Sequence, residues 1–508
     1  MRSGIALLIV GAALWTPVAG AQEAHSHPVP EKLGSVTFAT SCLPKVSHDF
    51  ERAVALLHSF AYSASEKAFS DVAAADPSCA MAHWGIAMSY YHQMWSPPGS
   101  GELSKGLVEV EQASRLHVRT ARERQFIAAI AAYYRDYDHL KHTLRAKAYE
   151  DAMSAAAKSN PNDTEVQVFY ALSLIATAPP EDKTHAKQKK ASLILEPIYR
   201  KYPDHPGVAH YLIHDYDSAE LAARGLGPAR AYSKIAPSAP HALHMPSHIF
   251  TRLGLWDDSV ASNIAARAAA RSQGDVGEEL HAMDYLVYAY LQRGRQADAE
   301  EIVAALSSMG GLLGNDFKVG YAATVMPIRL AVERGNWEAA AAVRPLPESA
   351  PNIGAIVFWA RAVGNSRAGR PEAASDDIAR LEASRRQLQD EGNGYWAAQT
   401  EVLATEAKAW QAAARSRADD AVQLLRQAAD EEDAVEKLPL TPGPIVPARE
   451  QLGELLLTMN RSSEALKEFR AALIAAPGRR GALAGAAKAA ELAGDAETAR
   501  HMRASLST

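Results

Sequence analysis

The sequence predicts an all-α protein, built as a right-handed α-solenoid of helix–turn–helix repeats. Helical periodicity of apolar residues dominates the chain, and the alternation expected of strands is almost absent. Alanine, leucine, glutamate and arginine, which are good helix formers, fill the periodic segments. Landmarks also recur at the period of about 34 residues that is typical of stacked helical hairpins. Because each hairpin packs only on its neighbours, all 508 residues can belong to one array.

Residues 1–21 are predicted to be a signal peptide. Arg2 provides a positive start, an apolar run extends from Ile5 to Trp15, and Ala19-Gly20-Ala21 provides an A-x-A cleavage pattern. An uncleaved membrane anchor is the alternative, but no later segment has the length and apolarity of a membrane-spanning helix. We therefore expect an exported chain, periplasmic or secreted, with no stable membrane insertion after cleavage. Residues 22–45, which contain several prolines, are predicted to form an N-terminal tail.

Cys42 and Cys79 are the only two cysteines, and both lie near the start of the expected mature chain. In an oxidising compartment they can pair and tie the lead-in segment to a helical repeat, so we expect a structural disulfide. Two buried free thiols are the alternative. A redox-active pair is disfavoured because the spacing is not C-x-x-C.

Charge and motif content argue against several function classes. The net charge of −6 is spread along the chain without a basic stripe, which argues against nucleic-acid binding. The sequence contains no P-loop, no G-x-G-x-x-G after a strand, no G-x-S-x-G and no H-E-x-x-H. The sequence therefore contains none of the motifs that usually indicate the common nucleotide-dependent and hydrolytic enzymes.

Along the chain, the predicted repeats fall into blocks. N-terminal repeats cover residues 46–206, central repeats cover 207–345, and further helical hairpins cover 346–437. A proline-rich loop at 438–450 interrupts the period, and C-terminal repeats cover 451–508. The last block carries the repeat anchors Gly453, Ala465, Phe469, Ala472 and Pro477. Small residues let the two helices approach, the aromatic ring fills the gap, and proline ends the second helix.

These anchors resemble those of the tetratricopeptide-repeat (TPR) superfamily. More closely, the chain is similar to exported bacterial TPR proteins of uncertain function, through the segments VALLHSFAYSASEKAF, DPSCAMAHWGIAMS, HALHMPSHIFTRLGLW, HAMDYLVYAYLQ and TPGPIVPARE. The resemblance spans most of the mature chain. It implies about ten repeats or repeat-like helix pairs with a concave binding groove. It brings no established catalytic residues, so none is carried over.

Two histidine pairs are the main functional signal. His210 and His214 form one pair and His244 and His248 the other, and the i, i+4 spacing places both rings of a pair on one face of a helix. The pairs lie 34 residues apart, from 210 to 244, so stacked repeats would bring all four rings into one hollow. Neutral imidazole is the commonest metal ligand, and two such pairs suit copper, zinc or iron. We predict these four histidines as metal ligands.

The TPR resemblance also implies which residues line the concave groove. Counting repeat positions from the turn glycines Gly254, Gly294 and Gly335 places further polar residues beside the four histidines. These predicted groove residues are His241, Arg252, His281, Asp284, Tyr288 and Arg329.

Three functions are consistent with this groove. The first is an exported binding protein that holds a transition metal or a metal-assisted ligand. The second is a metal-free scaffold, in which a hydrogen-bonded histidine network stiffens a groove that recognises a peptide, a partner protein or a small molecule. The third is a metal-dependent enzyme, for instance an oxidoreductase, in which Asp284 or Tyr288 acts as the acid–base group. The sequence names neither a substrate nor a partner.

Overall fold

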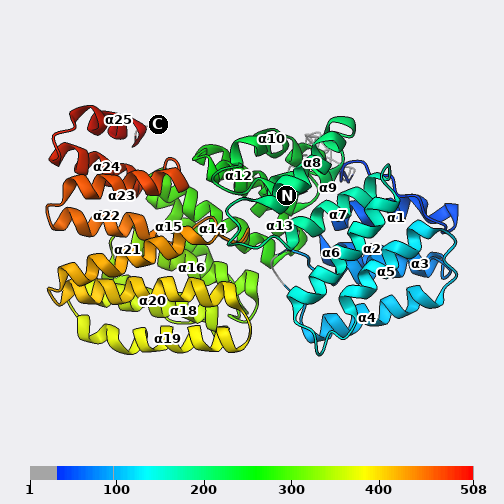
Figure 1. Ribbon diagram of the computed structural model, residues 1–508, viewed down its shortest axis with the longest axis horizontal. Coiled ribbons are helices and arrows are strands. Elements are labelled where there is room, and N and C mark those ends of the chain that lie inside the picture. Colours follow the sequence, from blue (N-terminus) through cyan, green and yellow to red (C-terminus); the bar gives the residue numbers. More distant parts are fainter. Residues whose placement is uncertain (1–30, 95–96, 507–508) are drawn as a thin grey trace, which may run out of the picture. The chain divides into compact units, whose positions relative to one another are not determined.

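The chain is helical throughout the part that the computed structural model describes, residues 31–94 and 97–506, with no β-strand in those ranges (Figure 1). The predicted signal peptide and the first part of the predicted tail lie outside the described residues. Lys32–Thr508 belong to one structural unit. None of the described helices combines the length and the apolarity that a bilayer crossing requires.

The N-terminal helices pack on one another in sequence order. They are α1 (Ser47–His58), α2 (Tyr62–Ala75), α3 (Ala80–Ser89), α4 (Ser100–Arg115), α5 (Ala121–Tyr134), α6 (His142–Ser159), α7 (Thr164–Ala176) and α8 (Ala186–Lys201).

The central helices continue the series and include three short ones, α11, α12 and α17. They are α9 (Pro206–Asp215), α10 (Leu226–Ile235), α11 (Pro240–His244), α12 (Pro246–Arg252), α13 (Trp256–Gln273), α14 (Val276–Gln292), α15 (Gln296–Ala305), α16 (Phe317–Glu333) and α17 (Trp337–Ala341).

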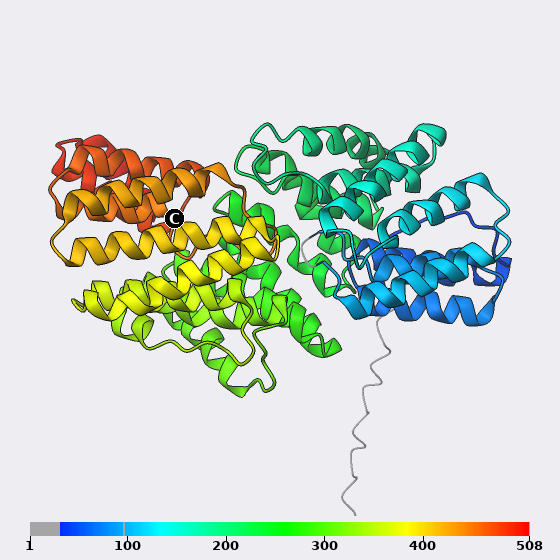
Figure 2. The same ribbon diagram turned by 60° about the horizontal axis from the view of Figure 1, so that its bottom comes forward.

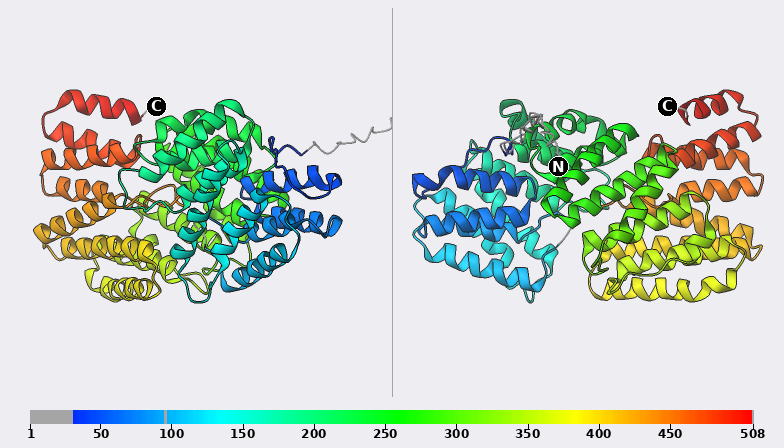
Figure 3. Two further views of the ribbon diagram at one scale, coloured as in Figure 1. Left: turned by 45° about the vertical axis from the view of Figure 1, so that its right-hand side comes forward. Right: turned by 180° about the vertical axis from the view of Figure 1, so that it is seen from behind.

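The C-terminal helices stack side by side in the order of the sequence (Figures 1 and 2). They are α18 (Pro351–Arg367), α19 (Ser375–Asp390), α20 (Gly394–Ala414), α21 (Ala418–Ala434), α22 (Ala448–Thr458), α23 (Ser462–Ala475), α24 (Arg480–Leu492) and α25 (Ala496–Leu506). The serial stacking is also visible from behind, for the N-terminal helices as well (Figure 3). The predicted fold class, an all-α array of helices that stack in the order of the sequence, is confirmed over the described residues.

The repeat packing depends on small residues that face aromatic rings. A Cβ atom on Gly453 would lie 2.8 Å from the Phe469 ring, and one on Gly485 would lie 2.2 Å from it. In the N-terminal repeats, a Cβ on Gly85 would lie 2.4 Å from the Phe69 ring. Helices approach closely at these positions because the missing side chain leaves room for the ring.

The segment predicted as a tail is packed over its described part. Phe38 is buried, and its ring centroid lies 5.3 Å from that of Phe50 and 5.5 Å from that of Trp84. Cys42 and Cys79 form a disulfide bond in this region. The residues from Lys32 onward are thus part of the N-terminal core, because apolar side chains there fill space between the first helices.

The central repeat that carries the second histidine pair is broken by proline. Pro246 has no backbone N–H to donate, and it starts α12 directly after α11. Further on, Gly254 ends the helix in the left-handed region, with φ of +69°. A Cβ there would lie 2.4 Å from the carbonyl oxygen of Pro477, so the central and C-terminal repeats are in close contact at this glycine.

A second set of contacts joins the same two regions. Trp256 Nε1 donates to Gly478 O at 3.1 Å, and the backbone N–H of Arg480 donates to Gln292 Oε1 at 2.9 Å. The predicted proline-rich loop is irregular only to residue 447, since α22 begins at Ala448. This segment contacts the central helices, since Arg329 of α16 donates to the carbonyl oxygens of Gly443 and Pro444.

Candidate metal centre

Six histidines meet inside the central repeats in two groups of three, each with one ligand nitrogen per ring within 4.8 Å of the others. Triad A consists of His210 and His214 from α9 and His241 from α11. Triad B consists of His244 from α11, His248 from α12 and His281 from α14. All six side chains are buried, with at most 6% exposed.

Triad B holds two ring nitrogens in direct contact. His244 Nδ1 lies 2.6 Å from Asn263 Oδ1, while Asn263 Nδ2 donates to Ser259 O at 2.7 Å. Because the asparagine oxygen can only accept, His244 Nδ1 carries the proton. The lone pair of neutral His244 is therefore on Nε2, which lies 3.0 Å from His248 Nε2.

The partner of His248 fixes its tautomer in the same way. His248 Nδ1 lies 2.9 Å from Asp217 Oδ2. Burial alone would raise the pKa of Asp217, but Lys437 and Arg252 outweigh burial and hold that pKa well below its usual range. The ionised carboxylate accepts, so His248 Nδ1 donates and the Nε2 of the neutral ring carries the lone pair. Two lone pairs then face each other at 3.0 Å, which is unfavourable unless a cation is shared between them.

His281 completes triad B. Its ring centroid lies 4.2 Å from that of His244, and its buried Nε2 has no hydrogen-bond partner among the described residues. Burial is the largest influence on all three rings and lowers the pKa of His244, of His248 and of His281. Each ring is thus favoured as neutral imidazole, the form that binds metal.

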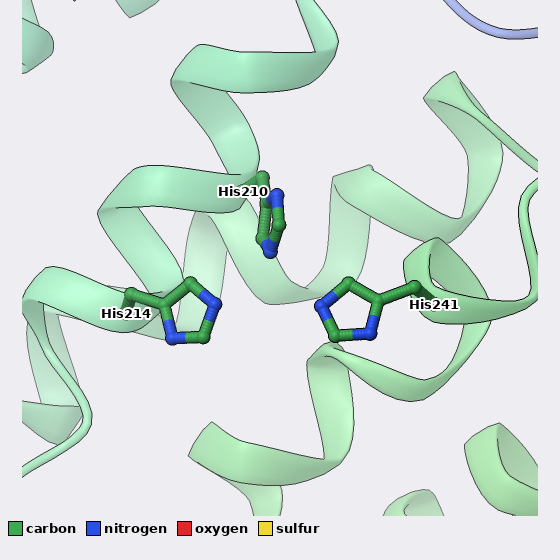
Figure 4. A group of neighbouring side chains, drawn as sticks. All are labelled: His210, His214 and His241. Carbon is green, nitrogen blue, oxygen red and sulfur yellow. The ribbon is translucent and has the colours of Figure 1, made fainter. Parts of the chain in front are cut away.

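The three rings of triad A also point ring nitrogens toward a common centre. In Figure 4 the nitrogen at the far end of each ring points into the space between His210, His214 and His241. His210 Nδ1 donates to the carbonyl oxygen of His58 at 2.6 Å, and its buried Nε2 has no partner within the part of the chain that the structure describes. His241 Nδ1 lies 3.3 Å from a carboxylate oxygen of Glu278. Burial lowers the pKa of His210 and His214 well below the usual value.

The four predicted ligands all lie in this row of rings, but their grouping differs from the prediction. The two i, i+4 pairs do not share one ion site. Each pair instead takes a third histidine from the next helix of the row, His241 for the first pair and His281 for the second. The groove counting named these two histidines as groove residues, not as ligands.

A third group of buried histidines provides a contrast. His58 Nε2 and His205 Nε2 donate to opposite oxygens of Glu165 at 2.9 and 2.8 Å. His58 Nδ1 lies 2.8 Å from the Tyr211 hydroxyl, and His205 Nδ1 accepts from the backbone N–H of Val208 at 3.3 Å. Every ring nitrogen here has a partner. This group is a satisfied hydrogen-bond network that joins α1, α7 and α9, and triads A and B are different because ring nitrogens point at one another.

The other predicted groove residues are buried under the chain itself. Arg329 donates to the carbonyl oxygens of Pro444 (2.8 Å) and Gly443 (3.3 Å), so the irregular segment before α22 lies against α16. Arg252 donates to Asp217 at 2.8 Å. The Tyr288 hydroxyl accepts from Arg479 Nη1 at 3.4 Å. These three predicted groove residues are therefore held by contacts within the chain, and Arg252 and Tyr288 also line a cavity.

Asp284 is a buried acidic residue of this region. Its carboxyl oxygens have no hydrogen-bond partner among the residues described, and Arg329 Nε lies 3.7 Å away. Burial raises the pKa of Asp284 to about 6, against the opposing effect of Arg329. The group can therefore accept or release a proton near neutral pH.

A cavity of about 460 Å³ lies on the far side of the ion pairs that surround Asp217. Thr251 and Arg252, one turn beyond His248, form part of its wall together with Tyr288 and Lys437. None of the six triad histidines lines it. The triads are thus separated from this cavity by one layer of side chains.

The sequence analysis missed the outer partners of the triads, which are Asn263, Glu278, Lys437 and the carbonyl of His58. Asn263 carried a usable signal, because it lies on the buried stripe of α13 with Val260 and Ala266, where an amide needs a partner. No local pattern in the sequence indicated Lys437, because it contacts Asp217 across a sequence separation of 220.

No family model matches this chain, and no curated protein sequence matches it. Solved structures with similar arrangement include a human IFIT1 dimer with m7Gppp-AAAA, at 13% identity and a TM-score of 0.35, covering 84% of this chain and 89% of that chain. They also include the APC/C hetero-tetramer Cut9–Hcn1, at 11% identity and a TM-score of 0.36, covering 83% of this chain and 78% of that chain.

Proposed function

We propose that this protein is an exported helical-repeat protein that binds a transition-metal ion, copper, zinc or iron, in triad B. The observation that carries the proposal is the 3.0 Å contact between His244 Nε2 and His248 Nε2, with both Nδ1 atoms committed as donors to other residues. Two nitrogens that bind one tetrahedral ion at 2.0–2.1 Å lie roughly 3.3 Å apart, so a shift of a few tenths of an ångström accommodates the ion.

A proton is the competing cation for the same gap. It would make one ring an imidazolium, buried and close to Lys437 and Arg252, which already neutralise Asp217. Burial opposes that charge, whereas the covalent character of metal–imidazole bonds offsets it. His281 Nε2 supplies a third donor, so a metal ion gains a bond that a shared proton does not.

The surroundings of triad B support this proposal. Metal-binding histidines usually donate their other ring N–H to a carboxylate or carbonyl, which fixes the tautomer and orients the ring. Asp217 does this for His248, and the side-chain oxygen of Asn263 does it for His244. Lys437 and Arg252 hold Asp217 in place, so the ligand geometry is supported beyond the ligands themselves.

Binding is favoured over turnover. The triad is buried, and the cavity of about 460 Å³ is not lined by any of its rings. A metal ion here is thus better placed for storage, transfer or structural support than for contact with a substrate in that cavity. An enzyme that used Asp284 as the acid–base group would need a route to the metal that by-passes the side chains around Asp217.

Export is supported by the N-terminal sequence and by the disulfide. Arg2, the apolar run from Ile5 and the A-x-A pattern are typical of a signal peptide, and the Cys42–Cys79 bond suits an oxidising compartment.

Elemental analysis of untagged protein, purified from metal-supplemented medium, tests the proposal. We expect bound copper, zinc or iron in the wild type and its loss in the double variant His244→Ala, His248→Ala. His139→Ala is the matched control, since His139 is an exposed histidine that pairs with Asp138. Wild-type protein that holds no metal after incubation with each ion, while the double variant only melts at a lower temperature, would show that the rings form a structural network instead.

A further inference from the structure

We infer that triads A and B together form one dinuclear centre, which binds two first-row transition-metal ions of the imidazole-preferring kind, copper or zinc. This inference rests on the proposed function of triad B and adds a second ion in triad A.

The first argument is the donor set of triad A. His210 Nε2 is buried and has no hydrogen-bond partner among the described residues, and its Nδ1 is held as a donor by the His58 carbonyl. The far nitrogens of His214 and His241 point toward the same space (Figure 4). A neutral His210 thus presents a lone pair to the centre of the triad, which is the arrangement that three-histidine metal sites require.

The second argument is the absence of a gap between the triads. The ring centroids of His214 and His248 lie 5.9 Å apart, and those of His241 and His244 lie 6.1 Å apart. Within triad A the centroids of His214 and His241 are 6.4 Å apart. The other rings within each triad are closer, for example 4.8 Å for His210 and His214 and 4.2 Å for His244 and His281. The nearest rings of different triads are thus no farther apart than the most distant rings of one triad, so two ions would be neighbours.

The third argument is that the two triads repeat one outer arrangement. In triad B, Asp217 accepts from His248 and is neutralised by Lys437 at 3.0 Å. In triad A, Glu278 accepts from His241 and is neutralised by Lys318 at 2.6 Å. Each half thus has three imidazoles and one outer carboxylate that pairs with a lysine, and in triad B the carboxylate of Asp217 pairs with Arg252 as well.

This charge balance indicates how two ions would be accommodated. Six neutral imidazoles bring no negative charge, and each carboxylate is already paired with a lysine. Two buried divalent ions would repel strongly unless a small anion lay between them. Three imidazoles fill three positions of a tetrahedral ion, so the fourth position of each ion is available to a shared anion such as hydroxide.

The decisive measurement is the metal content per chain. Untagged protein from zinc- or copper-supplemented medium is expected to hold two ions. His210→Ala is expected to hold one, and His281→Ala is expected to hold one, while the exposed-site control His139→Ala keeps two. Wild-type protein with a single ion that survives His210→Ala would overturn the inference and leave the proposed function intact. Wild-type protein with no ion contradicts the proposed function itself.

Electron paramagnetic resonance tests whether the two ions form one centre. Copper-loaded protein is first oxidised with ferricyanide. We expect the integrated Cu(II) signal of the wild type to fall well below its copper content, because neighbouring spins couple, and the signal of His210→Ala to equal its copper content. Two full, independent signals in the wild type would contradict a shared centre.

A third measurement needs no substitution and therefore remains valid if a variant fails to fold. Crystals of wild-type protein, with data collected at the copper or zinc absorption edge, are expected to show two anomalous peaks, one within each triad. A single peak, whether in triad B or between the triads, would overturn the dinuclear assignment.

Discussion

Lys437 Nζ lies 3.0 Å from Asp217 Oδ2, although the two residues are separated by 220 positions in the sequence. Asp217 follows α9, and Lys437 belongs to the irregular segment after α21. The same carboxylate accepts from His248 and from Arg252. A segment far along the chain, beyond α21, therefore helps to orient a triad B ring, although all six histidines lie between residues 210 and 281.

Asp217→Asn is expected to weaken metal binding by about 10–100-fold, the usual effect of losing an outer partner of a metal-binding histidine. The amide no longer fixes the His248 tautomer. It also leaves Lys437 and Arg252 with uncompensated buried charge. The free energy of unfolding should therefore be about 3–5 kcal/mol lower than in the wild type. Competition with a zinc chelator measures the affinity, and urea unfolding measures the stability.

Asp138→Asn is the control for that variant, because Asp138 is exposed and pairs with the exposed His139. Both quantities should match the wild type. Unchanged zinc affinity in Asp217→Asn would show that His248 is oriented by other contacts, or that it does not bind the metal.

The fold class was predictable because its signals are local. Turn glycines such as Gly254, and small residues such as Gly453 facing Phe469, act within one hairpin or between adjacent helices. Each repeat packs on its neighbour through the same kinds of contact. A structure predicted for single repeats therefore extends to the whole array. The packing of the irregular segment before α22 against α16 was not predictable in this way, since it depends on contacts such as Arg329 with Pro444 that link distant segments.

The site was predictable only in part, for a related reason. The i, i+4 spacing and the 34-residue period indicated His210, His214, His244 and His248 as neighbours. The grouping into triads depends on how α11, α12 and α14 are placed relative to α9, which includes the break before Pro246. Spacing along a straight helix does not contain that information.

The metal-free protein is expected to lose stability as the pH falls below about 6.5, the ordinary pKa of histidine. Burial lowers the pKa of five triad rings in the folded state, namely His210, His214, His244, His248 and His281. Below pH 6.5 the unfolded chain binds protons at these rings that the folded chain does not, so the free energy of unfolding decreases with falling pH. The contribution of these neutral rings to the free energy of unfolding is present above pH 6.5 and is lost in the acidic range.

Thermal unfolding of chelator-treated protein checks this expectation. The melting temperature should be several degrees lower at pH 5.5 than at pH 7.5. The dependence should be smaller in His244→Gln, His248→Gln, in which two of the titrating rings are absent. A melting temperature that is constant over this range would mean that the rings are not held neutral in the folded protein.

Arg479→Leu is expected to destabilise the protein by about 3–5 kcal/mol, the cost of breaking a buried ion pair by removing one partner. Arg479 is fully buried and donates to Glu450 at 2.6 Å and to Glu333 at 2.7 Å. Its loss leaves both carboxylates without their cation, at the contact between α16 and the C-terminal hairpins. Urea unfolding measures the change, and Arg461→Ala, which removes a partly exposed ion pair with Glu464, should show no measurable effect. Equal stabilities of the two variants would contradict a role for Arg479 in joining these regions.

Removal of the disulfide by Cys42→Ser, Cys79→Ser is expected to lower the free energy of unfolding by about 2–4 kcal/mol, because the bond closes a loop with a sequence separation of 37 and restricts the unfolded chain. Thiol alkylation and mass spectrometry connect this bond to export. Protein directed through the native N-terminal segment should contain no reactive thiol, whereas protein made in a reducing cytosol without residues 1–21 should contain two. Two alkylated cysteines in the exported protein would contradict both the bond and its proposed compartment.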